Sequence, residues 1–77
     1  VLRAQVGSFS DQQNALNLLE RVKHLYSGGR VQVVDLPEGK RYRVQIGQFS
    51  REAQAEAAAS HLESSLGLQA FVFRDDS

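Results

Sequence analysis

Residues 2–10 read LRAQVGSFS, and residues 42–50 repeat the pattern as YRVQIGQFS. In both copies apolar side chains alternate with Arg and Gln, and Gly, a polar residue, Phe and Ser follow. Strict alternation predicts a β-strand with one buried face and one face in water. The same polar pair is therefore expected on the open face of two related strands, as Arg3 and Gln5 on the first and Arg43 and Gln45 on the second. Function is expected on this face rather than at a catalytic residue.

The length and composition predict one small domain over residues 1–77. Nine basic and nine acidic side chains cancel, which argues against a nucleic acid partner, because such a partner is bound largely through phosphate charge. The chain has no Cys, which excludes disulfides, thiolate zinc sites and a cysteine nucleophile. It does not begin with Met and has no long apolar run, so we expect a module of a longer protein, with no membrane contact of its own. We also expect this module to be a monomer.

The first helix is expected between Ser10 and the glycine pair at residues 28–29. Ser10 is a favoured N-cap residue, and Gln13 completes a capping box three residues later. The apolar stripe of this helix consists of Ala15, Leu18, Leu19, Val22, Leu25 and Tyr26. Residues 31–34 then predict a second strand, which ends at the turn residues 37–39.

The second half repeats this plan. Ser50 is expected to cap a helix that ends at Gly67, and residues 68–73 predict the last strand. The stripe of this helix consists of Ala55, Ala58, Ala59, Leu62 and Leu66. The order β-α-β-β-α-β predicts an α+β, ferredoxin-like (split βαβ) architecture, a four-stranded antiparallel sheet with both helices on one face. Within it we expect strands one and three to be central neighbours running parallel, and strands two and four to be edges.

The alternation divides the side chains of the two central strands between two faces. Facing the helices we expect Leu2, Ala4, Val6, Tyr42, Val44 and Ile46, with Phe9 and Phe49 closing the ends of the core. On the open face we expect Arg3, Gln5, Arg41, Arg43 and Gln45, with Ser8 and Gln48 at the rim. The glycines at positions 7 and 47 are expected to let a ligand approach the backbone.

The chemistry of the open face suits a polar, uncharged ligand with occasional carboxylates. Gln offers two donors and an acceptor, and Arg offers a fork of five donors. A glycan of N-acetylated sugars fits this description. The alternative at this point is that the polar face does no more than stay hydrated.

Residues 5–9, QVGSF, together with the element order and the length, resemble the SPOR domain, the sporulation-related repeat. Residues 45–49, QIGQF, resemble the looser second repeat of that family, so the likeness covers the whole chain. The resemblance implies binding to peptidoglycan strands of alternating N-acetylglucosamine and N-acetylmuramic acid that have lost their stem peptides. It further implies a division septum in the Gram-negative periplasm. The implied host is a lipoprotein of the outer membrane that carries a lytic transglycosylase domain, whereas this domain is not an enzyme.

The resemblance also implies particular site residues. The family's strand-one Gln and the Ser three positions later correspond to Gln5 and Ser8. Arg41 stands near a position that is often Trp in relatives, and a last-strand contributor corresponds to Val72 or one of its neighbours. The full expected glycan site is Gln5, Ser8, Arg3, Arg41, Arg43, Gln45, Gln48 and Val72. Our hypothesis is that Arg43 or Arg3 pairs with the lactyl carboxylate that peptide removal leaves on muramic acid.

Other polar residues predict no catalytic or metal site and no cofactor. His24 and His61 are interpreted as surface residues, because neither has a second ligand at suitable spacing. Residues 75–76 are interpreted as a polar tail. Phe71 and Phe73 are expected to pack in the core, although a register slip would turn them outward as a stacking platform.

Three alternatives from other classes share this element order. An RNA-recognition module needs aromatic residues on strands one and three, where this chain has Arg and Gln. An acyl-phosphate hydrolase needs an Arg in the loop after strand one, and residues 7–10 contain none. A protein-interaction module pairing through the unguarded edge at residues 31–34 remains open.

Overall fold

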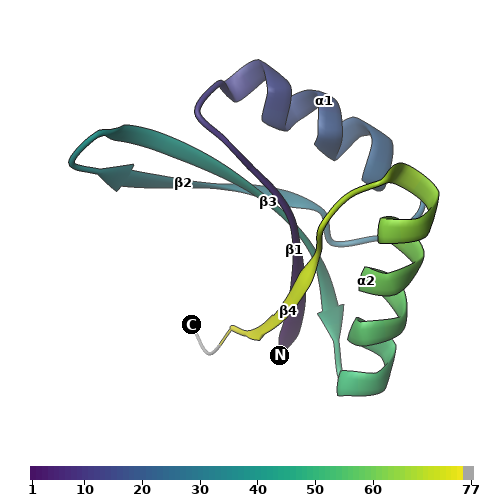
Figure 1. The fold of residues 1–77 in the computed structure, drawn as a ribbon. Coiled ribbons are helices and arrows are strands. Elements are labelled where there is room, and N and C mark those ends of the chain that lie inside the picture. The colour runs from purple at the N-terminus through teal and green to yellow at the C-terminus, as the bar shows by residue number, and fades with distance from the viewer. Residues whose placement is uncertain (76–77) are drawn as a thin grey trace.

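A computed structural model of the chain describes residues 1–75, which form a four-stranded sheet with two helices on one side (Figure 1). The elements are β1 (Leu2–Phe9), α1 (Gln12–Val22), β2 (Arg30–Leu36), β3 (Gly39–Phe49), α2 (Glu52–Leu66) and β4 (Phe71–Arg74). The strands are ordered β2-β3-β1-β4, so β1 and β3 are central and β2 and β4 are the edges. The predicted architecture is confirmed, although β4 is shorter than expected and begins at Phe71.

Every pair of neighbouring strands in this sheet is antiparallel. The expectation that β1 and β3 run parallel is therefore wrong. The crossover through α1 makes β2 parallel to β1, and the tight turn from β2 sends β3 back between them in the opposite direction (Figure 1). Gln5 nevertheless lies opposite Gln45, so the two glutamines are neighbours as expected.

Helix α1 begins one residue later than the sequence pattern suggested. Its N-cap is Asp11, whose Oδ1 accepts hydrogen bonds from the backbone N–H groups of Gln13 (2.7 Å) and Asn14 (3.4 Å). A carboxylate here also interacts favourably with the positive end of the helix dipole, so the prediction of a Ser10 cap is wrong. The Ser50 cap is also wrong, because α2 starts after Arg51 with no side-chain capping bond.

Asp11→Ala is expected to lower the free energy of unfolding by about 1 kcal/mol, because two amide groups of the first turn lose their acceptor. Ser10→Ala is the matched control, one residue away, and is expected to have no measurable effect. Urea denaturation followed by circular dichroism measures both changes. An equal loss of stability in the two variants would contradict the Asp11 cap.

The chain leaves α1 at Val22, before the glycine pair, and Leu25 is 46% exposed rather than in the core. Tyr26 packs edge-on against Phe49 and hydrogen-bonds through its hydroxyl to His61 Nδ1 (2.8 Å). Gly28, with a positive φ of 74°, then turns the chain toward β2. A Cβ there would lie 1.3 Å from the carbonyl oxygen of Gly47, so the loop before β2 rests directly on the backbone of β3.

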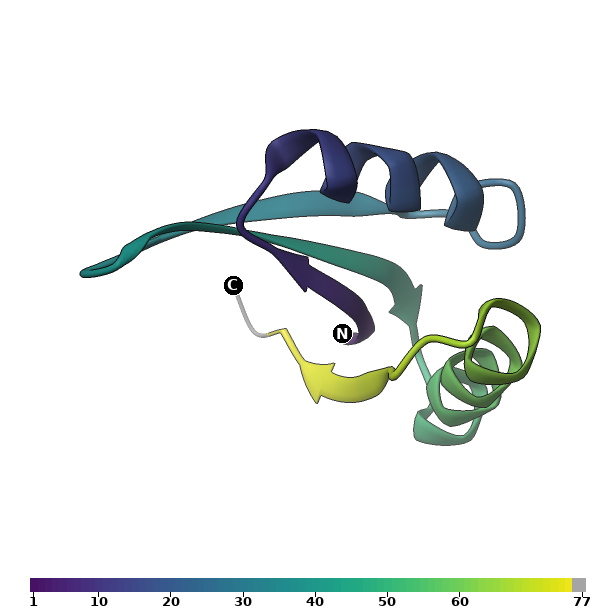
Figure 2. The same cartoon turned by 45° about the horizontal axis from the view of Figure 1, so that its top comes forward.

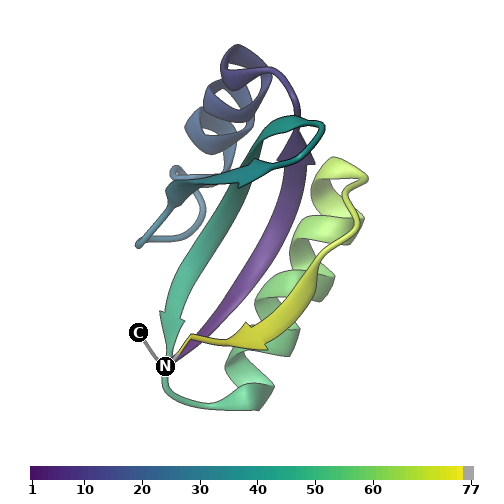
Figure 3. The same ribbon diagram turned by 90° about the vertical axis from the view of Figure 1, so that its left-hand side faces the viewer.

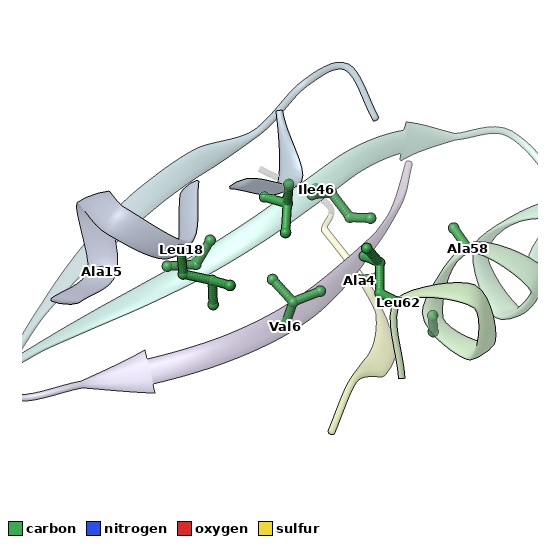
Figure 4. Close-up of a cluster of buried hydrophobic side chains, with 10 residues drawn as sticks. Ala4, Val6, Ala15, Leu18, Ile46, Ala58 and Leu62 are labelled. Carbon is green, nitrogen blue, oxygen red and sulfur yellow. The ribbon is translucent and has the colours of Figure 1, made fainter. Parts of the chain in front are cut away.

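Figure 2 shows the two helices beside the sheet, and the hydrophobic core fills the space between them (Figure 4). The sheet contributes Ala4, Val6, Val44 and Ile46, α1 contributes Ala15, Leu18 and Val22, and α2 contributes Ala58, Ala59 and Leu62. Leu2 and Tyr42 are only half-buried, because Leu2 is the first residue of β1 and Tyr42 lies opposite Phe9, where β1 ends. The predicted faces of both helices and both central strands are thus largely confirmed. No helix within residues 1–75 combines the length and the apolar character that a membrane crossing requires.

Candidate functional site

The sheet face opposite the helices is uncovered, and Figure 3 looks onto it. Residues that are partners across neighbouring strands share a face of the sheet. One row runs across all four strands through Phe71, Gln5, Gln45 and Arg30, and a second pairs Ser8, Arg43 and Gln32. The open face therefore carries the predicted Arg3, Gln5, Arg43 and Gln45, together with residues of both edge strands.

A hollow of about 340 Å³, here called the central hollow, lies on this face. Its lining consists of Gln5, Gln32, Arg43, Gln45, Phe71 and Phe73. The two phenylalanine rings stand side by side with centroids 6.2 Å apart, and Phe71 is 55% exposed. An amide-rich floor thus meets an aromatic wall.

The aromatic wall corrects two expectations about β4. Val72 packs with Ala70 against the core, so Val72 lies on the helix side of the sheet. Phe71 and Phe73 face the central hollow instead, and the expectation that they pack in the core is wrong. Because Phe71 is the partner of Gln5 and Phe73 that of Arg3, the register of β4 on β1 decides this orientation.

Gln45 is on the open face but is 1% exposed, because neighbouring polar side chains cover it. Its Oε1 accepts a hydrogen bond from Arg30 Nε (2.9 Å). Its Nε2 donates to Gln32 Oε1 (3.0 Å) and, at a longer distance, to Gln5 Oε1 (3.5 Å). Gln45 is therefore the centre of a polar network, rather than an exposed contact as expected.

Asp75 contacts this network, so the expectation of a polar tail is wrong for this residue. Asp76, the other residue of the expected tail, lies outside the described residues. Asp75 Oδ2 accepts from Arg3 Nε (2.7 Å) and Arg30 Nη2 (3.0 Å), and the Arg3 and Asp75 side chains are only 11% and 12% exposed. The Asp75 backbone N–H also donates to Val1 O (2.8 Å). The Arg3 guanidinium is therefore already paired with a carboxylate of this chain, that of Asp75. Within residues 1–75, the Arg43 guanidinium makes no side-chain hydrogen bond or ion pair, which leaves Arg43 as the candidate for a ligand carboxylate.

A β-bulge brings Ser8 onto the open face. The register between β1 and β3 shifts between Gln5 and Gly7, so that Val6 and Gly7 both point toward the helices. Ser8 therefore returns to the side of Gln5, three positions on. Its Oγ accepts from Arg41 Nε (3.2 Å) and Nη2 (3.1 Å), which makes these two a separate pair beyond the central hollow.

Both matched glycines have structural roles, because a side chain at either position would be crowded by the surrounding structure. A Cβ at Gly7 would lie 2.7 Å from Leu18 Cδ2 of α1, and one at Gly47 would lie 3.0 Å from the Leu2 carbonyl oxygen. Gln48 is exposed and lines a second hollow of about 510 Å³, which shares no lining residue with the central one. That second hollow is lined by Arg3, Ser27, Gly28, Gly29, Arg30, Gly47 and Gln48.

Gln32 and Arg30 lie on the open face, although neither is among the residues predicted for the site. The sequence carries a signal for these two residues, because Arg30, Gln32 and Val34 alternate with Val31 and Val33 along β2.

His24 and His61 are both exposed, and residues 1–75 contain no group of three or more His, Asp or Glu side chains that could hold a metal ion.

Comparison with known proteins gives matches over nearly the whole chain. The endolytic peptidoglycan transglycosylase RlpA of Salmonella typhi is 35% identical over 69 residues, which cover 88% of this chain and 17% of that protein. RlpA of Salmonella typhimurium gives the same identity and coverage. The chain thus spans about a sixth of the length of these relatives (17%).

Two solved structures have the same fold. The crystal structure of the RlpA SPOR domain from Pseudomonas aeruginosa has a TM-score of 0.87 at 17% identity, covering 97% of this chain and 100% of that chain. The solution structure of the peptidoglycan-binding domain of the B. subtilis cell wall lytic enzyme CwlC has a TM-score of 0.69 at 29% identity, covering 97% and 89%. The family model of the SPOR domain matches residues 2–74, as the resemblance in the sequence predicted. The chain belongs to the SPOR domain family.

Proposed function

We propose that this domain binds peptidoglycan, and within it glycan strands that lack stem peptides, through the central hollow of the open face. The observation that carries the proposal is the pairing of an aromatic wall, Phe71 and Phe73, with a floor of glutamines and Arg43. Sugar rings present C–H groups on their faces and polar groups at their edges. Such a ring suits a site that is apolar on one side and rich in amide and guanidinium groups on the other.

Arg43 supplies the preference for strands without peptides. The lactyl group of muramic acid carries the stem peptide through an amide, and removal of the peptide leaves a carboxylate. A guanidinium binds a carboxylate through charge-assisted hydrogen bonds, which are about twice as strong as neutral ones. A strand that still bears peptides lacks this charge and would place bulk above the sheet.

The relatives support the proposal. The B. subtilis neighbour is named as a peptidoglycan-binding domain, and the Salmonella relatives are named as peptidoglycan transglycosylases. By this analogy the chain is a non-catalytic binding module that directs a longer, cell-wall-cleaving protein. A site at the division septum in the Gram-negative periplasm would follow, because amidases produce peptide-free strands there.

The experiment is a pull-down with isolated sacculi before and after treatment with an amidase that removes stem peptides. Binding is expected to increase after treatment and to be micromolar, because a few hydrogen bonds contribute about 0.5–1.5 kcal/mol each. Binding that stays the same or falls after treatment would contradict the preference for peptide-free strands.

Salt separates this function from nucleic acid binding. Affinity for glycan is expected to fall by less than about threefold between 50 and 200 mM salt, because a single carboxylate contact is involved. A protein that makes six to ten phosphate contacts loses about 10³–10⁵ in affinity over the same range. The third class is a protein-interaction module that pairs through the edge of β2. Amide chemical shifts measured during titration test this class. Changes confined to the outer edge of β2, and absent from the central hollow, would identify a strand-pairing partner instead.

A further inference from the structure

A chain of hydrogen bonds determines which way the amides of the central hollow face. It begins at Asp75, whose Oδ2 is shared by Arg3 and Arg30. Because Asp75 binds the Nη2 atom of Arg30 (3.0 Å), the guanidinium is oriented with its Nε toward Gln45. Arg30 is thus held between a carboxylate on one side and an amide on the other.

The contact between Arg30 and Gln45 assigns the orientation of the Gln45 amide on chemical grounds. A guanidinium has five donors and no acceptor, so the Gln45 atom 2.9 Å from Arg30 Nε has to be the oxygen. The NH₂ group of Gln45 then points away from Arg30, toward Gln32 and Gln5. Residues 1–75 contain no buried side-chain N or O atom without a hydrogen-bond partner, so the reverse orientation would break a satisfied network.

The orientation of Gln45 passes on to its two neighbours. Gln45 Nε2 has only hydrogens to offer, so Gln32 and Gln5 each turn their Oε1 toward it, at 3.0 Å and 3.5 Å. The NH₂ groups of Gln32 and Gln5 are at the opposite ends of their amides and remain for a ligand. The remaining polar side chain of the lining, Arg43, also carries donors alone.

We propose that Arg30, held by Asp75, is a positioning residue that turns the NH₂ groups of Gln5 and Gln32 toward the ligand, which makes the central hollow rich in donors and selective for sugars whose substituents present acceptor oxygens. Acetamido carbonyls and carboxylates meet this requirement. A glucosamine whose acetyl group has been removed does not, because its ammonium group has donors alone and is repelled by Arg43. The inference rests on the proposed function for the identity of the ligand, whereas the amide orientation stands on the free protein.

The first test follows the side-chain amides of the free domain by NMR hydrogen exchange. In the unmodified protein, the Gln45 NH₂ protons are expected to exchange slowly and those of Gln5 and Gln32 rapidly. Arg30→Met, which removes the donor, is expected to raise the exchange rate of Gln45, and Arg30→Lys, which keeps a donor, to preserve slow exchange. Gln45 protons that exchange as fast as those of Gln5 and Gln32 in the unmodified protein would overturn the inference, with or without glycan.

The second test compares peptide-free glycan from amidase-treated sacculi before and after chemical N-deacetylation. The unmodified domain is expected to lose at least about tenfold in affinity after deacetylation, the size of one or two lost hydrogen bonds. Arg30→Met is expected to bind the acetylated glycan about fivefold more weakly and to discriminate less, because its amides are free to reverse. Asp75→Asn serves as a second, milder variant, expected to change binding in the same direction.

The controls separate the inferred selectivity of the central hollow from the proposed binding of peptidoglycan. Arg51→Met removes an exposed positive charge next to α2 and is expected to leave affinity unchanged. Equal affinity of the unmodified domain for acetylated and deacetylated glycan would overturn the inferred selectivity for acceptor groups and leave peptidoglycan binding intact. No binding to acetylated peptide-free glycan would overturn the proposed function, and the exchange experiment would still decide the orientation of the amides.

Discussion

Arg43→Met is expected to weaken binding of peptide-free glycan by at least about tenfold while the fold stays intact. A hydrogen bond to a charged group contributes about 1.5–3 kcal/mol, which corresponds to roughly 10–150-fold in affinity. Arg43 is half-buried in the lining of the central hollow, and no side chain within residues 1–75 depends on it for a hydrogen bond or an ion pair. Isothermal titration calorimetry with glycan from amidase-treated sacculi measures the loss, and thermal unfolding checks the fold.

Two further variants and one modified ligand sharpen this experiment. Arg43→Lys keeps the charge but loses the two-pronged geometry, so an intermediate affinity is expected. Arg21→Met, on the exposed side of α1, controls for the change in net charge and is expected to bind normally. With glycan whose lactyl carboxylates have been reduced to alcohols, the unmodified protein and Arg43→Met should bind nearly equally. An unchanged affinity of Arg43→Met for the native glycan would remove Arg43 from the site.

Gly28→Ala is expected to lower the free energy of unfolding by more than about 3 kcal/mol, or to prevent folding at 37 °C. The added Cβ would lie 1.3 Å from the Gly47 carbonyl oxygen and 2.4 Å from its carbonyl carbon. Because Gly47 is buried in a central strand, its backbone has little room to move away. Urea denaturation of the purified domain measures the change.

Gly67→Ala is a matched control for this substitution. Gly67 has nearly the same backbone angle, with φ of 68° against 74° at Gly28, but nothing lies within 4 Å of its added Cβ. Its cost is therefore limited to the left-handed conformation itself, about 1–2 kcal/mol. The difference between the two variants isolates the contact of the loop with β3. Equal unfolding midpoints for Gly28→Ala and Gly67→Ala would show that this contact is unimportant.

The sequence predicted the parts of this fold that depend on local periodicity. The alternation around Ala4, Val6, Val44 and Ile46 requires one buried face, and those four side chains are buried. The apolar spacing of Leu62 and the alanines before it likewise identified the buried face of α2. Each copy of the strand pattern is followed by one helix pattern. This order of elements left few ways to pair the strands.

Features that depend on how distant segments meet were not predictable from those patterns. Phe71 and Phe73 alternate with small apolar residues, so either face of β4 could have been the buried one, and only pairing with β1 decides. A two-residue period likewise places Gln5 and Ser8 on opposite faces, whereas the bulge at Val6 and Gly7 places them together. Asp75 looked like part of a tail because its partners are 45 and 72 positions away.

The hydrogen bond between Val1 and Asp75 places both ends of the described chain at the same end of the β1–β4 ladder. Tension applied through flanking segments would therefore pull β4 away from β1 and separate the paired residues of this ladder one pair after another. It would not act on all pairs at once by sliding the strands along each other. Asp75 would separate from Arg3 first, and Phe73 would follow. The aromatic side chains of the central hollow would consequently separate from its glutamines before the two helices lost their packing.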